Sequence, residues 1–560
     1  MRLTGVGGDA GSAGQPARAG VPAQPAAAQP PDAAGKAVIR AATPVLSIAP
    51  ALLAALLGGA ALAAAFPPAG IWPLAAAGPA VLAITLWGRS LRGALATGLA
   101  FGLGFFFPLL SWLVNVAWYA WTALAVAEAI VFAVLAVGQR LLLRLPAWPL
   151  AVAGWWVAAE AFRARWPWGF PWGRLAMSQA QAPTARWVAI GGPPLLSFLL
   201  ALAGATLAWL LLSLPPLARR GTGRQPARMV PAVAFAAAAG LALAGGLLPV
   251  DAAGRPVARA EVAAVQGNVP HARNLPDLLR ASEVTQNHAV ATEQLAAEVA
   301  AGSRPAPQVV VWPENSTDLD PMLYPAIYGV IARAVDAIRS PVLVGAVLQH
   351  PLRNTGQLWL PGRGPVEIYV KRQLVPFGEY IPMRGLLDKI TSLPDLQPVN
   401  FTPGHKAVVF RIGQIRLGDV ICYEIGFDNL VTSEVTAGAN LLTMQTNDAD
   451  FEIDGQLGET EQQLAMARIR AIEFDRAVVV ASTTGESAII APDGSLIVHS
   501  GTWRRALLEA RVPLRSVMTP AARAGQWPEY GIVAATVAAL LAAIGLAVAD
   551  RRRRSPGSPG

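Results

Sequence analysis

Three side chains that could act together in catalysis stand directly after apolar, strand-like runs in the second half of this 560-residue chain. Glu314 follows VVVWP, Lys371 follows VEIYV and Cys422 follows LGDVI. A thiol becomes a strong nucleophile when a nearby base accepts its proton and a nearby cation favours the thiolate. These residue types therefore supply the parts of a covalent nucleophilic site, if the fold brings them together.

Each of the three residues also has a structural explanation. Glu314 could cap the helix that follows it, and Lys371 could be a solvated strand residue. Cys422 is the only cysteine of the chain and could be an ordinary core residue, since buried thiols behave as small hydrophobes. Strand ends also collect polar residues for structural reasons, so the spacing alone leaves both interpretations open.

The elements that must position these residues are predicted by alternating patterns in the second half of the chain. β-rich runs lie at 260–269, 308–314, 340–347, 366–376, 408–424 and 440–446. Helical patterns lie between them at about 278–301, 322–339 and 459–475. Strands that alternate with helices predict an α/β domain, and the strand ends are where sites form in such sheets.

The chain as a whole is too apolar for an ordinary soluble protein. It is 54% hydrophobic and 14% charged, with a mean hydropathy of +0.43. About 20 apolar residues cross a bilayer. We expect eight such spans, at about 44–65, 71–88, 93–112, 117–138, 148–162, 187–213, 229–249 and 530–549. The fold class is therefore a membrane α-helical bundle plus an α/β domain.

Lys and Arg in the short connections predict the orientation of these spans. Arginine pairs or clusters fall in alternate loops, on the side of the amino-terminal tail, which we take as cytoplasmic. The predicted organisation is a disordered cytoplasmic tail at 1–43, seven transmembrane helices at 44–249, an extracytoplasmic catalytic domain at 250–525, an eighth transmembrane helix at 526–549 and a basic cytoplasmic tail at 550–560.

One connection, 163–186, lies outside and breaks the charge rule. Its arginines could meet anionic lipid headgroups, dock on the outer domain, or simply be tolerated in a loop. They are Arg163, Arg165, Arg174 and Arg186, and the same loop carries Trp166, Trp168 and Trp172, which suit an interfacial position. Within the fourth span, Glu128 is a functional candidate, although we favour a neutral carboxyl group that is hydrogen-bonded to a neighbouring helix.

Taken in order, WPENS, YVKRQLVPFGEYIP and GDVICYEIGF resemble the nitrilase superfamily. With seven apolar spans before them and one after, the chain resembles the apolipoprotein N-acyltransferases, bacterial membrane enzymes of that superfamily. The resemblance implies an αββα sandwich in which Glu314 is the general base, Lys371 stabilises the oxyanion and Cys422 is the nucleophile. It also implies a set of pocket residues, namely Glu379, Tyr423, Glu424, Trp312, Tyr380 and Asn447.

The resemblance further implies the reaction and its partners. An acyl chain would pass from a phospholipid such as phosphatidylethanolamine to Cys422 as a thioester, and then to the amino-terminal diacylglyceryl-cysteine of an apolipoprotein. We expect no metal, no other cofactor, no nucleic acid, a monomer, and a place in the bacterial plasma membrane. Asp450 stands where many relatives have Trp, and Leu275 lies in an arm without the usual Trp, so the acyl preference stays open.

Two other classes of function are kept as alternatives. A membrane-tethered carbon–nitrogen hydrolase would use the same three residues with water as the acceptor. A transporter or scaffold would need polar residues along its spans, and beyond Glu128 and Glu160 these are sparse.

Overall fold

The computed structural model describes residues 44–214, 229–249, 254–270, 277–389, 397–451 and 458–554. The predicted tail at 1–43, Leu275 in the arm after the first strand, and the last residues of the basic tail lie outside these ranges. Everything below concerns the described residues.

A helix lies in each of the eight predicted spans. These are α1 (Ile48–Ala63), α2 (Leu74–Leu86), α3 (Leu91–Leu109), α4 (Trp118–Leu142), α5 (Trp148–Arg163), α6 (Val188–Leu212), α8 (Met229–Leu243) and α15 (Trp527–Arg554). Five of the helical segments are long and apolar enough to cross a membrane, namely α3, α4, α15, α6 with the turn before it, and α8 with the turn after it. Transmembrane character is thus supported for five of the eight.

Of the other three helices, α1 and α2 are shorter than the prediction, whereas α5 fills its predicted span. At 1.5 Å per residue, the 13 residues of α2 extend about 20 Å, less than the ~30 Å of a bilayer core. Prolines explain part of this, since Pro73 stands immediately before α2 and Pro67 and Pro68 follow α1. Helix α6 is interrupted at Gly192, whose φ of +70° favours glycine.

The second half of the chain folds into two six-stranded sheets. The first has the order β12-β1-β2-β3-β4-β5 and the second β11-β10-β9-β8-β7-β6. The first sheet comprises β1 (Ala258–Gln266), β2 (Val309–Val311), β3 (Val342–Gln349), β4 (Leu352–Leu360), β5 (Gly364–Val370) and β12 (Ala506–Leu514). The second comprises β6 (Val409–Ile412), β7 (Ile415–Ile421), β8 (Leu441–Thr446), β9 (Val478–Ser482), β10 (Ala488–Ile490) and β11 (Leu496–His499). In each sheet three strands are parallel, β1-β2-β3 and β7-β8-β9.

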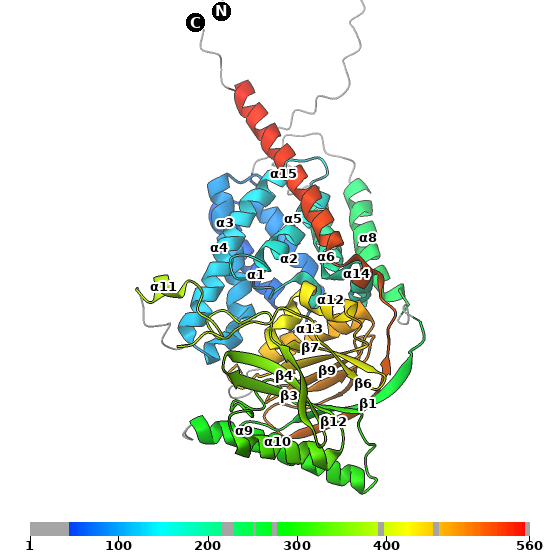
Figure 1. The fold of residues 1–560 in the computed structure, drawn as a ribbon. Coiled ribbons are helices and arrows are strands. Elements are labelled where there is room, and N and C mark those ends of the chain that lie inside the picture. Colours follow the sequence, from blue (N-terminus) through cyan, green and yellow to red (C-terminus); the bar gives the residue numbers. More distant parts are fainter. Residues whose placement is uncertain are drawn as a thin grey trace, which may run out of the picture. The chain divides into compact units, whose positions relative to one another are not determined.

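Helices cover the outer face of each sheet. Apolar side chains of α9 (Asp277–Ala300) and α10 (Pro325–Ile338) pack on the first sheet, and those of α12 (Asp428–Thr436) and α13 (Glu459–Phe474) pack on the second. Alternate residues of the facing strands form a separate core between the sheets. The αββα arrangement is therefore present (Figure 1).

The apolar core around α12 and α13 continues without a break into the helical bundle. One buried cluster contains Phe101 and Phe132 of the bundle together with Ile469 of α13 and Val431 of α12. Figure 1 shows these two helices between the sheets and the bundle, with α9 and α10 on the far side. Short elements complete the fold, including α11 (Arg384–Leu387), α14 (Pro520–Ala524) and the 3₁₀ turn η6 (Cys422–Gly426).

The observed strands differ from the predicted runs in two ways. The run predicted at 408–424 is a hairpin, because Gly413, with φ +56°, turns the chain between β6 and β7. In addition, β12 returns from the far end of the sequence to pair with β1 over its whole length. A single-sequence pattern does not reveal a pairing between strands about 250 residues apart.

Candidate active site

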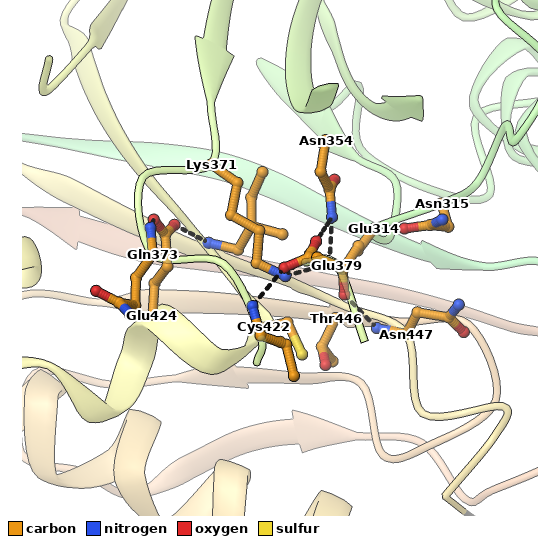
Figure 2. A network of polar contacts seen from close by, with 12 residues as sticks. Glu314, Asn315, Asn354, Lys371, Gln373, Glu379, Cys422, Glu424, Thr446 and Asn447 are labelled. Carbon is orange, nitrogen blue, oxygen red and sulfur yellow. Dashed lines mark hydrogen bonds and ion pairs between the residues drawn. The ribbon is translucent and has the colours of Figure 1, made fainter. Parts of the chain in front are cut away.

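The three predicted residues leave strands that point the same way. Glu314 follows β2, Lys371 follows β5 and Cys422 follows β7. β5 runs parallel to β3 because both are antiparallel to β4. Glu314, Lys371 and Cys422 therefore each stand just beyond the carboxyl end of a strand. The two edges meet, since the backbone N–H of Asn447, after β8, donates to Glu314 Oε2 at 3.1 Å. Figure 2 shows the resulting cluster, with the Cys422 sulfur beside it.

A buried ammonium lies between two carboxylates in this cluster. Lys371 Nζ donates to Glu314 Oε1 at 2.8 Å and to Glu379 Oε1 at 3.1 Å, and its side chain is only 1% exposed. Asn354 Nδ2, from β4, donates to the same two oxygens at 2.7 and 2.9 Å. The N–H of Val375 donates to the second oxygen of Glu379 at 2.8 Å. The base and the cation are therefore held rigidly, as an organised site requires.

Cys422 occupies a strained turn at the end of β7. Its φ is +53°, a left-handed conformation that a residue with a Cβ adopts at a cost of about 1–3 kcal/mol. The residue is 7% exposed, and Gln463 Nε2 donates to its sulfur at 3.4 Å. Such strain persists where the surroundings hold a side chain in one orientation, here toward the Glu314–Lys371 pair.

Burial and neighbouring charges set the protonation states of the three groups. Burial, then the charge of Glu314, raises the pKa of the Cys422 thiol well above its ordinary value, although Lys371 opposes this. Burial also raises the pKa of Glu314, with Lys371 opposing and Glu379 adding to the effect. Burial alone would lower the pKa of Lys371, but the two carboxylates outweigh it and raise that pKa well above the usual value. A neutral thiol thus rests beside a charged ammonium and a carboxylate that is a better base than an exposed glutamate.

Glu424, predicted as a pocket residue, braces the site from behind. Its carboxylate accepts hydrogen bonds from the N–H groups of Arg372, Gln373 and Ile421 at 2.7, 3.0 and 2.8 Å, and from the hydroxyl of Tyr369 at 2.8 Å. It is fully buried, and these four hydrogen bonds occupy both oxygens of its carboxylate. It therefore ties the loop after Lys371 to the turn that carries Cys422, and its assignment to the pocket stays a prediction.

Two other predicted pocket residues face away from the thiol. Trp312 is buried under α9, where its indole N–H donates to Thr292 Oγ1 at 2.9 Å. Tyr423 faces the bundle, where its hydroxyl donates to the carbonyl oxygen of Gly169 at 2.6 Å and its ring stacks on Trp172. Both belong to packing layers, and their assignment to the pocket stays a prediction.

Tyr380, Asn447 and Glu379 keep places close to the cluster. The backbone carbonyl oxygen of Tyr380 accepts a hydrogen bond from the N–H of Phe377 at 2.7 Å, which closes the turn that carries Glu379. The side chain of Asn447 accepts from Thr483 Oγ1 at 2.7 Å, which fixes the N–H that holds Glu314. Asp450 is exposed nearby.

Sequence reasoning missed two members of the cluster. Asn354 lies on β4, in no motif that pointed to it. Gln463 lies in the helical pattern predicted at 459–475, to which no functional role was attached. Its neighbour Gln462 fastens α13 to the bundle, because its amide donates to the carbonyls of Pro67 and Leu109 at 3.1 Å each. Two successive glutamines thus contact the bundle and the thiol.

A second buried carboxylate lies between the sheets, three residues before Cys422. Asp419 Oδ1 accepts from Thr443 Oγ1 at 2.7 Å, whereas its Oδ2 has no hydrogen-bond partner among the described residues. Gln445 Oε1 also has no hydrogen-bond partner within the described residues, whereas the amide nitrogen of the same side chain donates to the carbonyl of Trp312 at 2.6 Å. Both oxygens face Gly356, where an added Cβ would lie 2.3 Å from Asp419 Oδ2 and 2.7 Å from Gln445 Oε1. Burial raises the pKa of Asp419 well above its usual value, which favours the neutral form of its carboxyl group.

The buried charges of the bundle and of the 163–186 loop find partners. Glu128 on α4 pairs with Arg163 at the end of α5, which confirms the expected contact with a neighbouring helix. Arg174 holds Asp428 of α12 through two hydrogen bonds of 2.7 and 2.9 Å, so this arginine docks on the sandwich. Arg470, at the other side of Asp428, also pairs with Glu473 at 2.6 Å. Within the described residues, no group of three or more His, Cys, Asp or Glu is arranged to hold a metal ion.

The αββα sandwich with its Glu–Lys–Cys cluster defines the class of protein as carbon–nitrogen hydrolase-like, and the Carbon-nitrogen hydrolase family model matches residues 261–520. A second model, the Apolipoprotein N-acyltransferase N-terminal domain, matches residues 58–206 in the bundle. The apolipoprotein N-acyltransferase of Mycolicibacterium smegmatis is 37% identical over 521 residues, covering 88% of this chain and 85% of that relative. The chain belongs to the apolipoprotein N-acyltransferase family.

Other comparisons extend the list of similar proteins. The apolipoprotein N-acyltransferase of Azotobacter vinelandii is 32% identical over 542 residues, covering 91% of this chain and 97% of that relative. A solved structure of an amidase from Nesterenkonia sp. is 16% identical, covers 48% of this chain and 95% of that chain, and has a TM-score of 0.34.

Proposed function

We propose that this chain transfers an acyl chain from a membrane phospholipid, through a thioester on Cys422, to the amino-terminal diacylglyceryl-cysteine of an apolipoprotein. The observation that carries this proposal is the Lys371–Glu314 pair, 2.8 Å apart, beside the only thiol of the chain. The sandwich that holds this pair shares its apolar core with the bundle. A site built onto a membrane bundle suits substrates that are themselves lipids.

In the first half-reaction, Glu314 accepts the thiol proton as the sulfur attacks the ester carbonyl of the phospholipid. A C–S bond forms, the ester C–O bond breaks, and the lysophospholipid leaves with the proton from Glu314. Lys371 faces the negative charge that develops on the carbonyl oxygen, a stabilisation typically worth about 3 kcal/mol for one donor. Glu379 and Asn354 keep the ammonium and the base in place.

In the second half-reaction, the α-amino group of the apolipoprotein attacks the thioester carbonyl. A C–N bond forms, the C–S bond breaks, and Glu314 takes the proton of the amine and returns one to the thiolate. The enzyme is restored and the product is an amide. Every step uses groups of this chain and of its two substrates.

The proposed arrangement in the membrane is eight spans, with the domain at 250–525 on the extracytoplasmic side of a bacterial plasma membrane. Arginine placement in alternate loops supports this orientation. The five long apolar helices support the membrane location. A monomer stays a prediction.

The test uses the purified full chain in detergent with phosphatidylethanolamine and a peptide that begins with diacylglyceryl-cysteine. We expect N-acylated peptide and lysophospholipid in equal amounts, and neither from a Cys422→Ala variant with an unchanged melting temperature. The alternative hydrolase would release free fatty acid at the same rate with and without the peptide. That outcome would replace the acyltransferase by an amidase-like enzyme, against which the match of the bundle to the acyltransferase model already counts.

A further inference from the structure

Three of the four arginines in the 163–186 loop are held by contacts with other parts of the chain. Arg163 pairs with Glu128, and Arg174 is bound to Asp428. Arg186 donates to the carbonyls of Gly246 and Leu248 at 2.9 and 2.7 Å. Of these three arginines, Arg174 docks on the outer domain, whereas Arg163 and Arg186 are held inside the bundle, which leaves Arg165.

Arg165 differs from the others because its side chain is 46% exposed. It donates to the carbonyl of Ala161 at 3.0 Å, pairs with Glu529 at the start of α15, and lies 5.9 Å from the ring of Tyr530. These contacts hold the guanidinium in place without covering it. A guanidinium has five N–H donors, so an exposed one retains capacity for a further anion.

Arg165 and Glu529 line a cavity of about 370 Å³, a size typical of small-ligand sites. Polar groups converge on it from three separate parts of the chain. Besides the ion pair they include Gln373 from the loop after Lys371, Asn429 from α12 and Gln526 just before α15, with Trp168 on the wall. Its lining also includes Gly426, the last residue of η6, of which Cys422 is the first. The cavity thus borders the turn that carries the nucleophile.

Exposed aromatic side chains lie close in sequence to residues that line this cavity. Trp166 is 59% exposed, Trp527 is 76% exposed, and Phe162 and Tyr530 are also exposed. Phe162 and Tyr530 lie near the ends of α5 and α15 that adjoin the cavity. Aromatic residues at helix ends gather at the level of lipid headgroups, where one side of the ring meets hydrocarbon and the other meets water. The occupant to expect at this depth is a lipid headgroup.

We propose that this cavity binds the headgroup of an aminophospholipid, with the phosphate at Arg165 and the amine at Glu529. The lining carries two ion pairs, the largely buried Arg174–Asp428 and the more exposed Arg165–Glu529, and the charges of the second pair explain the choice of a zwitterion. A phosphate without an amine would be attracted by Arg165 but repelled by the adjacent carboxylate, whereas a phosphate joined to an ammonium matches both signs. The amides of Gln526 and Asn429 supply further donors at the same wall. This site is additional to the proposed acyl transfer and does not depend on it.

The test measures lipid binding by native mass spectrometry of the full chain in detergent. All proteins carry Cys422→Ala, so that no acyl transfer consumes the lipid. We expect phosphatidylethanolamine to bind at least fivefold more weakly to Arg165→Ala than to the parent, and Arg523→Ala, which removes an exposed arginine on nearby α14, to bind like the parent. Equal binding by Arg165→Ala and the parent would overturn the proposal.

A second variant tests the charge argument and covers the case in which Arg165→Ala fails to fold. Glu529→Gln removes the carboxylate at the same volume, so the preference for phosphatidylethanolamine over phosphatidylglycerol should fall at least threefold. An unchanged preference would overturn the assignment of the amine. Soluble glycerophosphoethanolamine should compete for the site in the parent, whereas competition by inorganic phosphate at the same concentration would show that the cavity binds phosphate and not a lipid headgroup.

Discussion

The hydroxyl of Tyr423 donates a 2.6 Å hydrogen bond to the carbonyl oxygen of Gly169. The residue after the proposed nucleophile is thereby fastened to a loop of the helical bundle, 254 positions away in the sequence. The ring of Tyr423 stacks on Trp172, whose indole N–H donates at 2.9 Å to Gln462, next to the glutamine that contacts the thiol. The bundle therefore helps to orient Cys422.

Tyr423→Phe tests this link. It keeps the ring stacking but leaves a buried carbonyl without its donor, at a cost of about 1–3 kcal/mol. We expect a lower melting temperature in detergent and slower acyl transfer. Tyr119→Phe, which changes an exposed tyrosine on α4, serves as the control. Equal melting temperatures and rates for both variants would mean that the contact has no such role.

Lys371→Met tests the buried cation. The change keeps much of the side-chain volume but leaves two carboxylates facing each other without a counterion, which is strongly destabilising for buried charges. We expect activity to fall at least 100-fold, since one oxyanion-stabilising group is worth about 10²–10³ in rate. Lys406→Met, at an exposed position, should keep full activity. Retention of a tenth or more of the activity by Lys371→Met would remove the lysine from the mechanism.

The pH dependence of kcat/KM tests the role of Glu314. A general base must be deprotonated, so activity should be lost as the pH falls through its pKa. Because burial raises that pKa, the acidic limb should lie above the ordinary range of a glutamate. Asn354→Ala removes a donor that lowers the same pKa and should move the limb to higher pH. A limb that does not move in the variant would contradict the assignment of Glu314.

Asp419→Asn tests the neutral carboxyl group between the sheets. Burial and then the charges of Glu424, Glu434 and Glu314 raise the pKa of Asp419, opposed by the hydrogen bond from Thr443. A raised carboxyl pKa means that the folded state binds more protons, so this group lowers the stability as the pH rises above about 4, the pKa of an unfolded aspartate. An asparagine amide donates a hydrogen bond but does not ionise. The stability of Asp419→Asn relative to the parent should therefore increase as the pH rises.

Asp419→Ala is the matched control, because it removes the carboxyl group that accepts from Thr443 Oγ1 and should be less stable at every pH. The measurement is the melting temperature of the three proteins between about pH 4 and pH 8. A constant difference between parent and Asp419→Asn over this range would indicate an ionised aspartate.

Strand and helix periodicity located much of the sandwich. Glu314, Lys371 and Cys422 stand at strand ends because each follows an apolar run, and the structure brings all three to one edge. The helices expected at 278–301, 322–339 and 459–475 are α9, α10 and α13 to within a few residues. Local patterns suffice for such elements because burial of one face repeats along the segment.

Other features depended on contacts between distant segments, which local patterns do not contain. The side chain of Trp312 alternates to the α9 face of β2, and the turn of η6 directs Tyr423 toward the bundle. Glu424 lies inside because backbone N–H groups from the loop after Lys371 converge on it. Two of the eight predicted spans hold shorter helices, α1 and α2, since an apolar segment does not show where its prolines end the helix.

The most direct test of the account is the intact mass of the full chain after incubation with phosphatidylethanolamine alone. We predict a single acyl adduct on Cys422, cleaved by hydroxylamine as a thioester, absent from Cys422→Ala, and discharged by a diacylglyceryl-cysteine peptide faster than by water. An enzyme that transfers acyl chains at the normal rate without this adduct, or with Cys422 replaced by alanine, would contradict it.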